Sequence, residues 1–241
     1  MTEGRGLFRR YRQLAVLASL AFATAICLTL LAVRVAYSAN RMYWFLAWNL
    51  FLAWLPVLCS LAAYNAFKRH NRLSWLVVAG CALAWLLFFP NAPYMLTDIQ
   101  HLQPRTDAPL WFDVLLVVAY AWTGLFLGLV SLFLMQALVR RAAGALASWA
   151  FALGVLGVSG FGIYIGRFLR WNSWDVLVSP GGLLADLMDA AQHPLLHARS
   201  FAFSGLFSLF LVAAYFMFVA FTQLQLDAPS GLSDNAHVFD Q

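Results

Sequence analysis

Asp98 and His101 are the two side chains whose types and spacing most readily suggest catalysis. They lie three residues apart, which would place both on one face of a short helix. A carboxylate and an imidazole in that arrangement could ligate a divalent metal or act as an acid–base relay. Two ligands alone do not define a metal site, and the sequence contains no His-Glu-x-x-His or similar zinc motif. We therefore assign no metal ligands and identify no cofactor, and a capping or salt-bridge role for Asp98 is the alternative to catalysis.

A second polar segment combines arginine with tryptophan and short polar side chains. Arg167 and Arg170 are three residues apart, and Trp171 and Trp174 repeat that offset. A guanidinium group can bind a phosphate or a carboxylate through two parallel hydrogen bonds. The alternative is that each arginine simply reaches lipid headgroups from the end of a membrane span. Together with two asparagines from earlier in the chain, the candidate ligand-binding residues are Asn49, Asn91, Arg167, Arg170, Trp171, Asn172, Trp174 and Asp175.

The two asparagines interrupt apolar sequence. An amide such as that of Asn49 needs a hydrogen-bond partner in apolar surroundings, so it either joins two helices or points into a polar cavity. Asn91 directly follows Pro90, and a second proline follows two residues later. Because proline disfavours helical geometry in the residue before it, we expect Phe89 and Ala92 to be extended. Such a break must be buried in protein or line a wet cavity, unless Asn91 satisfies the freed backbone groups itself.

The composition shows what surrounds these residues. Of 241 residues, 63% are hydrophobic and only 10% are charged, whereas soluble chains carry about 25% charged residues. Lipid must therefore be the solvent for most of the protein. The net charge of +5 is not concentrated in a long basic run, so we predict no nucleic-acid partner. Cys27, Cys59 and Cys81 lie in apolar stretches without a paired spacing, which favours packing roles over disulfides or metal binding.

Six apolar stretches are long enough for helices that cross a bilayer, which needs roughly 20 residues each. They are too long and too continuous for barrel strands, so the predicted fold class is an all-α, polytopic transmembrane bundle. Residues 183–191 predict a short amphipathic helix on the outer surface between spans five and six. We expect a basic N-terminus (1–13), a membrane domain (14–222) and a polar, disordered tail (223–241). The predicted spans are 14–33, 43–63, 74–94, 112–139, 146–168 and 201–222.

Lysine and arginine in the loops predict the orientation. Nine of the fifteen lysines and arginines lie on one side, before the first span and after the second and fourth spans, and the other six, including Arg34, lie on the opposite side. The positive-inside rule then places both termini in the cytoplasm and both polar segments on the outer side. The first span could also be mistaken for a signal peptide, but its apolar stretch is longer than the roughly 7–15 residues of a signal core.

Spans four and five carry Gly-x-x-x-Gly motifs. Gly124 and Gly128 form one, and Gly162 and Gly166 form the other. Small residues at this spacing allow close approach of backbones in a membrane. We therefore expect tight packing, with the second motif placing Arg167 at the end of a buried helix.

Three segments together resemble one family. They are 48–56, 89–102 and 166–175, and they are similar to the hallmark segments of the bacterial membrane proteins grouped as domain of unknown function 1361. The resemblance covers roughly residues 14–222 and implies a multi-pass protein of the bacterial inner membrane, but it carries no catalytic role. Our favoured hypothesis is an outward-facing polar pocket that binds an anionic lipid headgroup or a lipid-linked molecule. The alternatives are a membrane enzyme using Asp98 and His101, and an assembly factor that docks a membrane-protein partner.

Overall fold

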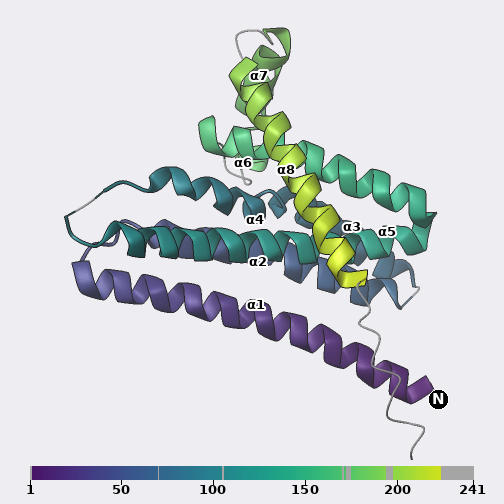
Figure 1. Ribbon diagram of the computed structural model, residues 1–241. Coiled ribbons are helices and arrows are strands. Elements are labelled where there is room, and N and C mark those ends of the chain that lie inside the picture. The colour runs from purple at the N-terminus through teal and green to yellow at the C-terminus, as the bar shows by residue number, and fades with distance from the viewer. Residues whose placement is uncertain are drawn as a thin grey trace, which may run out of the picture.

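The computed structural model describes residues 2–69, 71–104, 106–169, 171, 175–193 and 198–223. All the regular secondary structure in these residues is helical (Figure 1). The helices are α1 (Thr2–Ser38), α2 (Trp44–Phe67), α3 (Arg72–Phe88), α4 (Asn91–Tyr94), the 3₁₀ helix η1 (Met95–His101), α5 (Leu110–Phe168), α6 (Asp175–Val178), α7 (Pro180–Gln192) and α8 (Ala198–Gln223). The predicted all-α membrane fold is confirmed, and the amphipathic helix expected at 183–191 is part of α7.

Five of these helical stretches are long and apolar enough to cross a membrane. One of them, α5, has 59 residues and would be roughly 90 Å long if straight, about three times the thickness of a bilayer core. It folds back at Gly144, whose φ of 88° lies in the left-handed region that glycine adopts without a Cβ penalty. In Figure 1 the point where α5 reverses direction lies at the right of the view, opposite the loop that follows α1 and the loop that precedes α5. The two halves of α5 therefore supply the predicted fourth and fifth spans.

Two buried clusters hold the bundle together. One joins α3, both halves of α5 and α8, and it includes Trp85, Leu156 and Tyr215. The other joins α1, α2, the α4–η1 segment and the first half of α5, and it includes Leu46 and Leu127. Because α2, α4 and α5 contribute to the second cluster, their relative positions are fixed where the polar residues of α2 and η1 meet.

The chain does not become extended at the prolines, so that sequence-based prediction is wrong. Phe89 has helical φ and ψ of −54° and −42°, and Ala92 lies within α4. The helical path survives because Phe89 N–H still bonds to Trp85 O at 2.7 Å, and Tyr94 N–H bonds to Pro90 O at 3.0 Å. Asn91 Nδ2 also donates to Phe88 O at 3.1 Å. The prolines thus divide the helix into short pieces without unwinding it.

The α4 segment lies between two glycine motifs of α5. A Cβ on Gly124 would stand 2.7 Å from Ala92 O, and one on Gly128 would stand 3.3 Å from Ala92 Cβ. On the other half of α5, a Cβ on Gly162 would contact Pro90 at 3.5 Å, and one on Gly166 would lie 3.5 Å from the Tyr94 ring. The expected close packing is confirmed, and its partner is the proline-containing segment.

Candidate functional site

Asp98 is the centre of a buried polar network. Its carboxylate is 1% exposed and accepts hydrogen bonds from Asn49 Nδ2 at 3.0 Å and from Arg167 Nη1 at 3.2 Å. These three residues come from α2, η1 and the end of α5. The carboxylate thus joins three parts of the chain that the sequence separates widely, and each of its oxygens has a donor.

Arg167 reaches this network from the last turn of α5. Its Nη2 donates to Thr97 O at 2.5 Å, and its Nη1 donates to Tyr94 Oη at 3.2 Å as well as to Asp98. The guanidinium carbon also lies 5.4 Å from the centre of the Tyr94 ring, close enough for a cation–π interaction. The positive charge of Arg167 is therefore compensated inside the protein, by Asp98 and by two oxygen acceptors.

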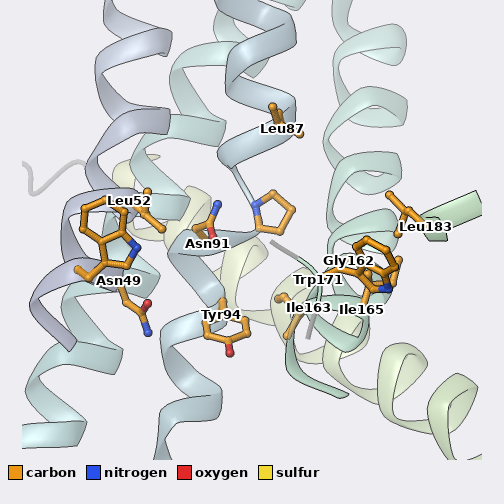
Figure 2. Close-up of a pocket in the computed structure, with 13 residues that line it drawn as sticks. Asn49, Leu52, Leu87, Asn91, Tyr94, Gly162, Ile163, Ile165, Trp171 and Leu183 are labelled. Carbon is orange, nitrogen blue, oxygen red and sulfur yellow. The ribbon is translucent and has the colours of Figure 1, made fainter. Parts of the chain in front are cut away.

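A pocket of about 220 Å³ adjoins this network. Asn49 and Tyr94 belong to both, so the hydrogen bonds to Asp98 and Arg167 hold two walls of the pocket. Figure 2 shows Asn91 and Tyr94 between the side chains of α2 and those of α5 and α7. The lining residues are Trp48, Asn49, Leu52, Leu87, Pro90, Asn91, Tyr94, Gly162, Ile163, Ile165, Gly166, Trp171 and Leu183. Amide and phenol groups thus share the pocket with aliphatic and indole surfaces.

Trp171 connects the pocket to α7. Its indole Nε1 donates to Asp186 Oδ2 at 2.7 Å. The indole also packs against Gly182, where an added Cβ would come within 2.9 Å of the ring. Because Leu183 follows and lines the pocket, α7 covers one side of it through Trp171 and its own first turn.

The structure brings together several of the predicted site residues. Asn49 and Asn91 line the pocket with Trp171, while Arg167 lies behind its wall and bonds to Asp98. Asp175 begins α6. The remaining three candidates, Arg170, Asn172 and Trp174, lie outside the described residues.

The two side chains of the candidate catalytic pair make different direct contacts. Asp98 faces Arg167 and Asn49, whereas His101 packs edge-on against Phe45 with ring centres 4.9 Å apart. Within the described ranges, no three His, Cys, Asp or Glu side chains are grouped so that they could hold a metal ion. The salt-bridge role considered for Asp98 is thus confirmed by its 3.2 Å contact with Arg167.

A second polar cluster was missed at the sequence level. Arg34, counted among loop charges, is only 2% exposed, and its Nε donates to Asp113 Oδ1 at 2.5 Å. Tyr43 Oη donates to the other Asp113 oxygen at 3.3 Å, and Arg34 Nη2 contacts Asp107 at 3.3 Å. The available signal was that Arg34 ends one apolar stretch and Asp113 begins another, because charged side chains at such positions usually have partners.

The long apolar helices and the polar interior define a multi-pass helical membrane protein. The model of the family described as protein of unknown function (DUF1361) matches residues 48–219, which include every described element of the pocket. The chain belongs to this family, as its hallmark segments indicated. No curated protein and no solved structure matches the chain.

Proposed function

We propose that this protein binds the polar headgroup of an anionic membrane lipid, or of a lipid-linked molecule, in the pocket between α2, α4, α5 and α7. The observation that carries the proposal is the lining of that pocket. Asn49 and Tyr94 provide polar atoms beside Leu52 and Ile163, a mixture that suits a molecule with a polar head and an apolar body.

The position of the pocket supports a lipid rather than a solute from water. It lies where α4 ends the third span and α5 ends the fifth, and the Trp48 side chain at its edge is 54% exposed. Indole rings favour the headgroup level of a bilayer. On the predicted topology this level is that of the outer leaflet of a bacterial inner membrane. A headgroup could then enter the pocket while its chains stay in lipid.

Preference for a negative charge depends on Arg170 in this proposal. Arg167 is already paired with Asp98 at 3.2 Å, so it has little free charge to offer a ligand. Arg170 follows it by three residues in the sequence. A guanidinium fork is required for two parallel bonds to a phosphate, and lysine cannot replace it.

The test is lipid retention measured by native mass spectrometry on detergent-purified protein. Phosphatidylglycerol is the anionic probe and phosphatidylcholine of the same chains is the zwitterionic one. We expect wild type to retain phosphatidylglycerol preferentially, and both Arg170→Lys and Arg170→Ala to weaken that retention by about tenfold or more, the size expected for losing a charged hydrogen bond. If both variants retain phosphatidylglycerol as wild type does, Arg170 is only an interfacial anchor and the anionic preference is refuted.

A pocket-filling variant tests the location independently. Gly162→Leu places a branched side chain where the pocket meets Pro90, whose ring is 3.5 Å from the expected Cβ. Gly157→Leu is the matched control, because its Cβ meets nothing within 4 Å. We expect the first variant to lose bound lipid and the second to retain it. Full retention by folded Gly162→Leu protein would show that the lipid binds elsewhere.

A further inference from the structure

A group of basic side chains lies at the end of the bundle where α5 reverses direction (Figure 1). Lys68 is roughly 28 Å farther along the axis of α2 than Asn49, at about 1.5 Å per residue, so this end is distant from the first pocket. One candidate span ends at Phe67 and the next begins at Arg72, which places the group at a bilayer surface. Its members are Lys68, Arg69, Arg72, Arg140 and Arg141, and all five are exposed.

Two of these cations converge on one aromatic ring. Lys68 Nζ lies 4.5 Å from the centre of the Tyr64 ring, and Arg141 Cζ lies 5.0 Å from the same centre. Tyr64 is buried, so its ring is a fixed base for both side chains. An aromatic ring attracts a cation through its quadrupole but has no net charge. The ring therefore positions Lys68 and Arg141 without neutralising either of them.

No carboxylate neutralises these two charges within the part of the chain that the structure describes. The ion pairs formed there by lysine or arginine involve Arg34 and Arg167. The sequence contains no Asp or Glu from residue 4 to 97 or from residue 114 to 174, so α2, α3 and the reversal of α5 provide no acid at this end. Like charges repel each other. A bound group with two negative charges would remove that repulsion.

The surroundings indicate that this group belongs to a lipid. Trp75, in the first turn of α3, is 51% exposed, and its ring meets Phe67 edge-on with centres 5.4 Å apart. Indole rings favour the headgroup level of a bilayer. Leu73 and Leu76 are also exposed on α3, which provides apolar surface for acyl chains. On the predicted topology this is the cytoplasmic leaflet, where basic sites between membrane helices bind headgroups that carry several phosphate charges.

We infer that Lys68 and Arg141 form a site for a lipid headgroup with two phosphate groups, the chemistry of cardiolipin. Each cation contacts one phosphate, and the chains lie along the exposed apolar side chains of α3. The inference does not rest on the proposed function. The pocket at Asn49 and Tyr94 is expected to distinguish an anionic headgroup from a zwitterionic one, whereas this site distinguishes two phosphates from one.

The experiment offers equimolar cardiolipin and phosphatidylglycerol to detergent-purified protein. Native mass spectrometry measures which lipid is retained. We expect wild type to favour cardiolipin by about tenfold, because its second phosphate can accept a second charged hydrogen bond. Equal retention of the two lipids would overturn the inference.

Neutralising either cation shows whether the preference arises at this site. Lys68→Gln and Arg141→Gln each leave one cation, so each should lose most of the preference for cardiolipin. Arg69→Gln is the matched control, because it removes the same charge from the same turn while the described cation–π contacts of Tyr64 involve Lys68 and Arg141. All three side chains are exposed, so folding should be preserved.

Two outcomes of these variants would refute the site. A preference that survives in both Lys68→Gln and Arg141→Gln would place the second phosphate elsewhere. An equal loss in Arg69→Gln would mean that diffuse positive charge, rather than the pair on Tyr64, attracts the lipid.

Pyrophosphate distinguishes a lipid from a soluble anion as the occupant. It has two phosphate groups but no chains, so at the same concentration it should not displace cardiolipin from wild type. Displacement would mean that the site binds soluble diphosphates, and it would overturn the assignment to a lipid.

Discussion

Arg167 directs its guanidinium group into the protein. Its Nη1 and Nη2 contact Tyr94 Oη, Asp98 Oδ1 and Thr97 O, and its side chain is only 9% exposed. Burying a charge is costly unless it is paired and hydrogen-bonded, and here both conditions are met. The residue thus acts mainly by fixing η1 and α4 against the end of α5, which in turn fixes the Tyr94 wall of the pocket.

Breaking this pair from either side should destabilise the protein. Asp98→Asn leaves Arg167 buried without its counter-ion. Arg167→Gln likewise leaves the Asp98 carboxylate buried without a counter-ion. Each change should cost about 3–5 kcal/mol, as expected for removing one partner of a buried pair. Thermal unfolding in detergent, followed by circular dichroism, measures the loss.

The double variant separates pairing from packing. If the charges interact as described, Asp98→Asn combined with Arg167→Gln should lose less than the sum of the single changes, because no unpaired charge remains. Strictly additive losses would mean that the two side chains stabilise the fold independently.

The individual polar residues could be found from sequence, but their partners could not. Asn49, Asp98 and Arg167 were all candidates because each interrupts or ends an apolar stretch. Whether these side chains contact one another depends on how α2, η1 and α5 pack, which the sequence does not reveal. For this reason the catalytic hypothesis considered Asp98 and the ligand-binding hypothesis considered Arg167, without connecting the two. Arg34 and Asp113 were overlooked as a pair for the same reason, since they contact each other across 79 positions of the chain.

At the level of elements, the glycines of α5 allow the α4 segment to pack closely between the two halves of that helix. The Gly-x-x-x-Gly spacing predicted close approach, but only the structure identifies what approaches. The two prolines led to the wrong prediction of extended backbone because local preference is only one of several contributions to the backbone conformation. Packing of Ala92, which is fully buried, against Gly124 and Gly128 favours a compact helical path.

Adding a single methyl group should affect the tightly packed Gly124 but not the loosely surrounded Gly154. Gly124→Ala places a Cβ 2.7 Å from both Ala92 O and Met95 Sδ, so α4 must shift, and we expect a lower melting temperature and lower folded yield. In Gly154→Ala, by contrast, the Cβ meets nothing within 4 Å. That control should be neutral or gain up to about 1 kcal/mol from helix propensity. Equal melting temperatures and folded yields for the two variants would contradict the close packing of α4 against Gly124.

For the molecule as a whole, the all-helical fold with several long apolar helices followed from hydropathy and length alone. Each apolar stretch had to be helical in lipid because backbone groups have no other partners there. Because α5 folds back at Gly144, its two halves correspond to two of the predicted spans. What hydropathy could not supply was the arrangement of the helices around α4, which depends on side-chain shape.

The predicted topology can be tested by thiol labelling of intact cells. Single cysteines at Thr106 and Ser179, introduced without the three native cysteines, should react with an impermeant reagent added from outside. Arg69→Cys, in the exposed turn between α2 and α3, should react only after lysis, since the positive-inside rule places this turn in the cytoplasm. The opposite pattern would invert the orientation and place the pocket on the cytoplasmic side.

The two-sided enclosure of α4 also has a consequence for biosynthesis. A chain is made from its N-terminus, and its earlier parts begin to fold first. The segment from Pro90 to Tyr94 is translated before either glycine motif that encloses it, and the second motif, Gly162 and Gly166, comes well after the first. The nascent protein must therefore hold a helix interrupted by prolines in the membrane until the second half of α5 has been inserted. We expect the interval between these two insertions to be the stage at which the unfinished chain depends most on insertion machinery or chaperones.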